Sequence, residues 1–490
     1  MSGLRDRLGW AIVLVGALVA RQAAGAQSLT LATAQGAVHG KLVNQGSVRA
    51  FLGIPYAAPP VGPLRWQAPQ PPAAWHGVRD ATHFAARCEQ PTIWKDYLFL
   101  DHGASEDCLY LNVYTPAAAA PGKRLPVMVW IHGGGYTAGA GSEPRYTDSQ
   151  LPGHGVVLVT LNYRLGVFGF LASTGLARQN GGAAGNYGLM DMAAALQWVQ
   201  HNIGRFGGDA HNVTIFGESA GSWAVSTLMA APSTFGLYAK VIGESGASFT
   251  GLLGADPLDK RSSRDEAWVE SLGVHSVEQL RALPAATILT AAASKPVGWF
   301  SPVVDGQFLP ASPSATFAQG KQAHVPLLAG WNHDERTATL SKGMTVAKWQ
   351  AFAQQTYGAR AAAFLAAFPA GSDEEAVHSA DAYTTAQFIG EATWQWIEAH
   401  THTGAAPVYR YRFDLASPPS EVHPEGKYAF HSAELEYVFG TLDTRRGATW
   451  RPEDRKLSEQ MMEYWTNFAR SGDPNGAGLP QWPRYDQQHQ

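Results

Sequence analysis

The feature that most constrains the fold is a series of short apolar runs separated by segments with helical periodicity. Most of these runs are rich in β-branched residues and nearly continuous in apolar side chains, which is typical of strands buried on both faces. Between them, residues 190–202 place apolar side chains on one face of a predicted helix. The alternation predicts an α/β fold with a mostly parallel sheet and helices on both sides. The predicted strands are residues 125–131, 156–161, 212–216, 239–243, 325–329 and 408–413.

Composition excludes several classes of protein. Hydrophobic residues make up 45% of the 490 residues and charged residues 16%, so the chain can bury enough area to fold and is not disordered. The net charge of −4 gives no support to nucleic-acid binding, which needs a concentrated basic face. Two helical, Ala-rich segments, residues 252–300 and 340–400, are interpreted as insertions packed over one end of the sheet.

Residues 1–26 have the pattern of a signal peptide. Arg5 and Arg7 precede an apolar run over residues 10–20, and Ala24-Gly25-Ala26 supplies the small residues of a cleavage site. The alternative, an anchoring helix, is disfavoured because the run is much shorter than the roughly 20 residues that span a bilayer. We therefore expect cleavage after Ala26 and a secreted or periplasmic protein without a transmembrane segment.

Cysteine usage agrees with export. The chain has two cysteines, Cys88 and Cys108, which is too few for a disulfide framework or a cysteine-based metal site. In an oxidising compartment they are expected to close a loop, while two separate buried thiols remain the alternative.

Ser219 is the candidate nucleophile. It is the central residue of Gly217-Glu-Ser-Ala-Gly221, which follows a predicted strand and precedes a predicted helix. This is the context of a nucleophile elbow, the strained turn that exposes a reactive serine. The alternative is a strand-to-helix glycine turn with an ordinary surface serine.

A second glycine-rich segment could bind an oxyanion. His132-Gly-Gly-Gly135 follows the predicted strand 125–131, and glycines allow the main chain to direct several N–H groups at one point. The N–H groups of Gly134, Gly135 and Ala220 are the expected donors. The alternative is a flexible loop.

Several longer strings resemble the type-B carboxylesterase family, the cholinesterase-like branch of the α/β-hydrolases. The similarity extends from about residue 30 to Trp482 and implies one α/β-hydrolase domain over residues 27–490. The strings are residues 51–60, 64–66, 105–113, 162–170, 185–191 and 202–209, together with the elbow.

The resemblance also implies the other two members of a catalytic triad. In α/β-hydrolases the acid and then the histidine follow the serine in the chain. Glu335 ends a segment similar to the family's acid motif, with Asp334 as the alternative, and His431 lies in a segment similar to the histidine motif. Arg336 departs from the pattern, since the family most often has glycine there. The histidine would accept the serine proton with a pKa near 6.5, and the chemistry requires neither a metal nor an organic cofactor.

Other residues are expected to support the site or contact the substrate. Ser245 matches a family position that hydrogen-bonds the triad acid, and Glu218 lies within the elbow. Ion pairs of Arg65 with Glu106 and of Arg164 with Asp191 are expected to be structural. The substrate pocket is expected to include Trp94, Trp223, Trp299 and Phe300.

The sequence thus predicts a serine carboxylesterase acting on small-molecule esters, bulky or aromatic ones of the p-nitrobenzyl type included. Leu98 stands where cholinesterases place an aromatic anchor, which disfavours choline esters. A lipase acting on longer acyl chains and a non-catalytic binding module of the same family are the alternatives.

Overall fold

A computed structural model describes residues 28–94, 97–118, 122–249, 254–294, 298–336 and 340–486. The predicted signal peptide, residues 1–26, lies outside the described residues. Within the described residues, no helix has the length and hydrophobicity needed to span a bilayer.

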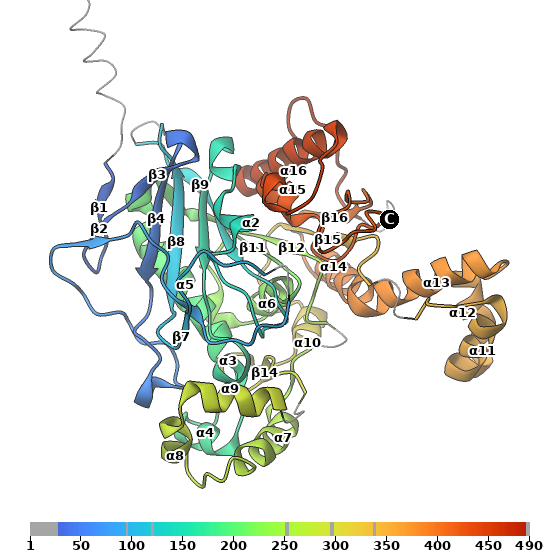
Figure 1. Cartoon of the computed structure of the whole chain (residues 1–490), viewed down its shortest axis with the longest axis horizontal. Coiled ribbons are helices and arrows are strands. Elements are labelled where there is room, and N and C mark those ends of the chain that lie inside the picture. The colour runs from blue at the N-terminus through green and yellow to red at the C-terminus, as the bar shows by residue number, and fades with distance from the viewer. Residues whose placement is uncertain are drawn as a thin grey trace, which may run out of the picture.

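A mixed sheet forms the centre of the molecule (Figure 1). Its nine described strands follow the order β16-β15-β12-β11-β9-β10-β8-β4-β3. The six strands from β16 to β10 are mutually parallel, and β8, β4 and β3 complete the sheet with antiparallel pairings. The strands are β3 (Lys41–Val43), β4 (Val48–Pro55), β8 (Tyr110–Pro116), β9 (Leu125–Ile131), β10 (Val157–Leu161), β11 (Gly208–Glu218), β12 (Lys240–Glu244), β15 (Leu327–Asn332) and β16 (Val408–Phe413).

The parallel part of the sheet confirms the fold predicted from the apolar runs, since each run lies in a strand of this region. The antiparallel strands β4 and β8 were not predicted. In β4, Arg49, Gly53 and Pro55 interrupt the apolar pattern although the whole strand is buried. The conformation of this segment therefore depends on its burial in the folded protein and cannot be predicted from the local pattern of apolar residues.

Side chains of the strands alternate between two hydrophobic cores. In β9, Val127 and Val129 face the core that includes helices α5 and α6, whereas Met128 and Trp130 face the core that includes α15 and α16. This period of two is the geometry of a strand buried on both faces. The sheet is therefore the middle of three layers, with helices on each side.

The helices of the described residues connect these strands or form insertions. They are α2 (Pro144–Thr147), α3 (Gly166–Phe170), α4 (Thr174–Gln179), α5 (Tyr187–Asn202), α6 (Ala220–Leu228), α7 (Leu258–Glu270), α8 (Val277–Ala282), α9 (Ala285–Ser294), α10 (Pro313–Ala318), α11 (Val346–Tyr357), α12 (Ala361–Ala367), α13 (Asp373–Thr385), α14 (Glu391–Thr403), α15 (Leu435–Phe439) and α16 (Pro452–Ser471). Small additional sheets are formed by β1 (Thr30–Ala32), β2 (Ala37–His39) and β5 (Val78–Asp80), by β6 (Arg87–Cys88) and β7 (Ala104–Ser105), and by β13 (Asp256–Pro257) and β14 (Val303–Val304).

The two predicted insertions are both helical, but they differ in their position relative to the central sheet. Helices α7, α8 and α9 lie together beside α3 and α4, whereas α11, α12 and α13 project away from the sheet (Figure 1). The projecting helices have a small core of their own around Trp349, Phe364 and Tyr383. The loop after α9 and the π-helical turn η7 (Ala386–Gly390) after α13 return to the central body, where they contribute to the cavity described below.

Both predicted ion pairs are present. Arg65 Nε donates to Glu106 Oε1 at 2.6 Å, and Arg164 Nη2 donates to Asp191 Oδ1 at 2.7 Å. The Arg164 pair is fully buried beside the first turn of α5. Breaking a buried pair of this kind leaves one charge unpaired in the interior, so its role is structural.

Candidate active site

Ser219 lies in a strained turn between β11 and α6. Its φ is 55° and its ψ −121°, a conformation that non-glycine residues rarely adopt. A Cβ on Gly217 would lie 2.6 Å from the Ile131 carbonyl oxygen, and one on Gly221 would lie 2.0 Å from the same atom. The two glycines are therefore required for the close approach of β11 and α6 to β9, and the turn has the form of a nucleophile elbow.

The serine, histidine and glutamate predicted from the sequence are brought together. The Ser219 hydroxyl lies 2.9 Å from His431 Nε2, and His431 Nδ1 lies 2.6 Å from Glu335 Oε2. Glu335 follows β15, and its other carboxylate oxygen accepts the Asn332 backbone N–H at 2.7 Å. Because a carboxylate only accepts, Nδ1 carries the proton and Nε2 of the neutral imidazole is left to accept from Ser219. The alternative acid, Asp334, instead accepts the backbone N–H of Ala429.

Glu218 is the second carboxylate next to His431. Its Oε1 lies 3.3 Å from His431 Nε2 and accepts the Ser432 hydroxyl at 2.7 Å. Burial lowers the pKa of His431, but the negative charges of Glu218 and Glu335 outweigh burial and raise this pKa to about 9. The two carboxylates thus shift the pKa of His431 upward from the 6.5 of an unperturbed histidine.

Two further glutamates are buried behind Glu218. Burial raises the pKa of Glu244 to about 8, although the Trp465 indole N–H donates to its carboxylate at 2.8 Å. Burial also raises the pKa of Glu434 well above its ordinary value, and the charge of Glu218 adds to this increase. Like charges at close range in a low-dielectric interior favour protonation. Burial and the proximity of like charges therefore raise the pKa of both Glu244 and Glu434.

The glycine loop lies directly over Ser219. A Cβ on Gly133 would lie 3.1 Å from the Cβ of Ser219, and one on Gly134 would lie 1.9 Å from the Ala138 carbonyl oxygen. Gly134 and Gly135 have φ values of 96° and 60°. Both also line the cavity that contains Ser219. Glycine suits this path of the main chain, because the positive φ values and the close neighbours both oppose a Cβ there.

A cavity of about 530 Å³ contains Ser219 and His431. Its lining includes three of the four predicted pocket residues, Trp94, Trp223 and Trp299. It also includes Phe388 of η7, whose ring packs edge-on against the His431 ring at 5.2 Å between centroids. Phe388 was not among the pocket residues predicted from the sequence.

The structure places two of the predicted residues, Phe300 and Ser245, away from their expected contacts. Phe300 does not line the cavity but packs against Trp268 in the core, at 5.7 Å between ring centroids. The hydroxyl of Ser245 is buried and has no hydrogen-bond partner among the described residues, so it does not hold Glu335. The backbone of Ser245 contributes instead, since its N–H donates to the Gly330 carbonyl at 2.8 Å.

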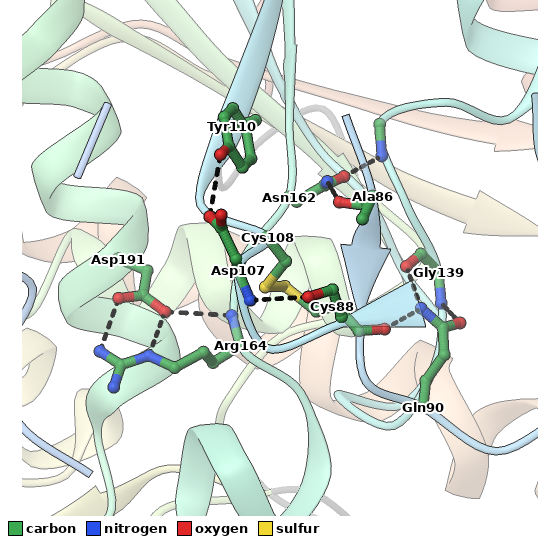
Figure 2. Close-up of a disulfide and its surroundings, with 12 residues drawn as sticks. Ala86, Cys88, Gln90, Asp107, Cys108, Tyr110, Gly139, Asn162, Arg164 and Asp191 are labelled. Atoms are coloured by element: carbon green, nitrogen blue, oxygen red, sulfur yellow. Dashed lines mark hydrogen bonds and ion pairs between the residues drawn. A yellow bond between two sulfur atoms is a disulfide. The ribbon is translucent and has the colours of Figure 1, made fainter. Parts of the chain in front are cut away.

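Cys88 and Cys108 form a disulfide, as predicted (Figure 2). Gln90, just inside the loop, exchanges two hydrogen bonds of 2.9 Å with the backbone of Gly139 (Figure 2). Between the cysteines, the chain brings Trp94, Tyr97 and Leu98 to the cavity. The disulfide and Gln90 therefore fix the base of a loop that forms one wall of the site.

The fold and the geometry around Ser219 are those of an α/β-hydrolase. A sequence model of the carboxylesterase family matches residues 27–490. The chain is 37% identical over 470 residues to the para-nitrobenzyl esterase of Bacillus subtilis, covering 91% of each protein. It is 38% identical over 489 residues to the human cocaine esterase, covering 92% of this chain and 84% of that protein.

Solved structures give the same result. A para-nitrobenzyl esterase structure superposes with a TM-score of 0.79 at 36% identity, covering 94% of each chain. A carboxylesterase of Geobacillus stearothermophilus superposes with a TM-score of 0.80 at 34% identity, again covering 94% of each chain. The chain belongs to the carboxylesterase family and is a carboxylic ester hydrolase.

Proposed function

We propose that this protein is an exported serine carboxylesterase, in which residues 27–490 form one α/β-hydrolase domain and Ser219, His431 and Glu335 form the catalytic triad. The observation that carries this proposal is the 2.9 Å contact between the Ser219 hydroxyl and His431 Nε2 within the cavity. A serine hydroxyl is a weak nucleophile at neutral pH and needs such a base.

The reaction follows from this geometry. As Ser219 Oγ attacks the ester carbonyl carbon, its proton moves to His431 Nε2. The carbonyl oxygen becomes an oxyanion, which the N–H groups of Gly134, Gly135 and Ala220 stabilise. Glu335 stabilises the imidazolium without taking its proton.

Collapse of the tetrahedral intermediate breaks the bond to the alcohol, which leaves with the proton from His431. An acyl-Ser219 ester remains. A water molecule then attacks this ester, transferring its own proton to the imidazole, and the acid is released as the proton returns to Ser219 Oγ. The serine, the histidine and the acid thereby return to their starting states.

The substrates proposed are small carboxylic esters, bulky or aromatic ones included. Tryptophan and phenylalanine rings line the cavity, and its volume of about 530 Å³ is in the range of sites for small organic molecules. In the disulfide loop, the rings of Trp94 and Tyr97 pack together at 4.9 Å between centroids and form an aromatic part of the cavity wall.

Export through a signal peptide ending at Ala26 is part of the proposal. The disulfide supports it, because such bonds persist mainly in oxidising compartments. N-terminal sequencing of the protein recovered outside the cytoplasm tests it. A mature chain beginning at Gln27 is expected, and an intact N-terminus on a membrane-bound protein would contradict cleavage.

The experiment for the activity measures hydrolysis of p-nitrophenyl esters, from acetate to palmitate, by the wild type and by Ser219→Ala. We expect highest activity on short chains and a loss of several orders of magnitude in the variant. A long-chain optimum would indicate a lipase. Equal inactivity of both proteins would indicate a binding module, and equal activity would place the nucleophile elsewhere.

A further inference from the structure

The arginines that line the cavity beside Ser219 differ in whether a carboxylate pairs with them. The lining of this cavity includes four arginines, Arg145, Arg336, Arg445 and Arg446. Arg145 Nε lies 2.9 Å from Glu143, and Arg445 pairs with Glu436. All four side chains of these two pairs are buried or nearly so. Their charges are neutralised within the wall of the cavity.

Arg336 differs from these paired arginines. It is exposed, and among the described residues no carboxylate pairs with its guanidinium and no acceptor receives its N–H groups. Its recorded contact is with an aromatic ring, since its Cζ lies 5.3 Å from the centroid of Phe388. A guanidinium has five donors in a planar fork that matches a carboxylate. Within the described part of the chain, no partner occupies this fork in Arg336, which lines the cavity.

Phe388 contacts both Arg336 and His431, so Arg336 lies on the His431 side of the site. One part of the ring contacts the guanidinium, and the ring also packs edge-on against His431. His431 must reach the leaving oxygen of the ester to protonate it. The alcohol part of the substrate therefore lies on the side of His431, towards Phe388 and Arg336.

The backbone of Arg336 is held from two directions. The preceding residue, Glu335, contacts His431, and the Arg336 carbonyl accepts the Thr384 hydroxyl at 2.8 Å. A cation whose main chain is fixed next to the triad loses less freedom when it binds an anion. This distinguishes Arg336 from an arginine on a free surface.

Arg446 is the other exposed arginine of the lining, and its contact with Glu421 is through the backbone. The backbone N–H of Glu421 donates to the Arg446 carbonyl at 3.1 Å, and Glu421 also lines the cavity. Of the two exposed arginines, Arg336 is the one that follows Glu335 and contacts Phe388, whose ring packs against His431. Arg336 is therefore the exposed arginine on the leaving-group side.

We infer that the site favours esters whose alcohol part has a carboxylate, and that Arg336 binds this carboxylate. This inference rests on the proposed function and adds the chemical class of the leaving group. Ion pairing at a partly exposed site gives a modest preference that salt reduces. Arg336 is thus a specificity residue and has no part in bond breaking.

The test compares two acetates of equal size, 4-acetoxybenzoic acid and 4-acetoxybenzamide, whose leaving phenols differ in charge. For each enzyme we take the ratio of kcat/KM for the charged ester to that for the neutral one. Comparing ratios between variants cancels the intrinsic reactivity of the two esters. The variants are Arg336→Gln, Arg336→Lys and Arg360→Gln, the last an exposed arginine of the projecting helices that changes net charge equally.

We expect Arg336→Gln to lower the ratio about 3- to 10-fold, and Arg336→Lys to retain part of the preference. Arg360→Gln is expected to keep the wild-type ratio, and added salt should reduce the ratio of the wild type towards that of Arg336→Gln. Equal ratios in the wild type and Arg336→Gln would overturn the inference while leaving the esterase activity established by the neutral ester. A wild type inactive on both acetates would instead overturn the proposed function, and the inference with it.

A second pair of substrates tests whether Arg336 binds the alcohol part of the ester or its acyl part. 4-Nitrophenyl hemisuccinate has its carboxylate in the acyl part, and 4-nitrophenyl butyrate is its uncharged counterpart. If Arg336→Gln changes the ratio for this pair and not for the acetates, Arg336 binds the acyl part and the inference about the alcohol is wrong.

Discussion

Glu218 Oε1 lies 3.3 Å from His431 Nε2, the nitrogen that also faces the Ser219 hydroxyl. The residue before the nucleophile thus places a negative charge beside the base. An imidazole with a carboxylate at each nitrogen holds its proton more tightly than one with a single partner. This relationship determines how the activity should depend on pH.

We expect kcat/KM for a neutral ester to rise with pH, with a midpoint near 9. The imidazole must be neutral to accept the serine proton, and its pKa is raised to about 9 in the folded protein. A raised pKa leaves mostly imidazolium at pH 7, so activity increases as pH rises through that value. A pH profile of kcat/KM measures this directly, and a midpoint near 6.5 would contradict the role given to the two carboxylates.

Glu218→Gln should move this midpoint to lower pH. The substitution removes one of the two charges that raise the pKa of His431 while keeping the size of the side chain. Glu425→Gln, an exposed residue outside the cavity lining, provides the matched control for net charge. An equal midpoint in all three proteins would show that Glu218 does not act on the imidazole.

Glu335→Gln should lower kcat by roughly 10³- to 10⁴-fold. The amide cannot stabilise an imidazolium as a carboxylate does, and it can present a donor to Nδ1, which favours the wrong tautomer. Asp334→Asn is the matched control, because that carboxylate accepts the Ala429 N–H and does not contact His431. The assignment of the acid would be wrong if Asp334→Asn showed the larger loss.

Gly134→Ala should lower kcat about 10²- to 10³-fold, as expected for a damaged oxyanion site. The added Cβ would meet the Ala138 carbonyl oxygen at 1.9 Å, and φ is 96°, so the loop over Ser219 has to shift. Gly153→Ala is the control, since nothing lies within 4 Å of the added atom there. Steady-state kinetics gives kcat for Gly134→Ala and Gly153→Ala. Similar kcat values for the two variants would argue against this loop as the oxyanion site.

Replacing both cysteines by serine should lower the free energy of unfolding by about 3 kcal/mol, in the chain-entropy model for a loop of 20 residues. The activity should fall as well, because the loop includes Trp94, Tyr97 and Leu98 of the cavity wall. Urea denaturation and kcat/KM of the double variant measure the two effects. Unchanged kcat/KM would show that the disulfide does not position this wall.

The parts of the site that sequence predicts best are those where one backbone conformation requires particular residues. The glycines around Ser219 and in residues 133–135 are examples, because an added Cβ would collide with neighbouring main chain or, at Gly135, with the side chain of Trp299. Glu335 and His431 are distant in sequence from Ser219. They were identified by their order in the chain and by family resemblance.

Side-chain direction in irregular segments could not be predicted. Trp299 and Phe300 are adjacent aromatic residues in a loop, where no regular period assigns faces. Trp299 lines the cavity, whereas Phe300 packs against Trp268. Similarly, the position of Ser245 was predicted to matter, but its hydroxyl does not reach Glu335.

The central claim is that Ser219 is the nucleophile that His431 activates. Its most direct test is labelling of the wild type and Ser219→Ala with a fluorophosphonate, followed by peptide mass spectrometry. Attack by the serine oxygen displaces fluoride and leaves a stable phosphonyl ester. We predict one adduct, on the peptide containing Ser219, formed in proportion to the loss of esterase activity and absent from the variant. An adduct on another residue that abolishes activity, or a labelled and active Ser219→Ala variant, would contradict the account.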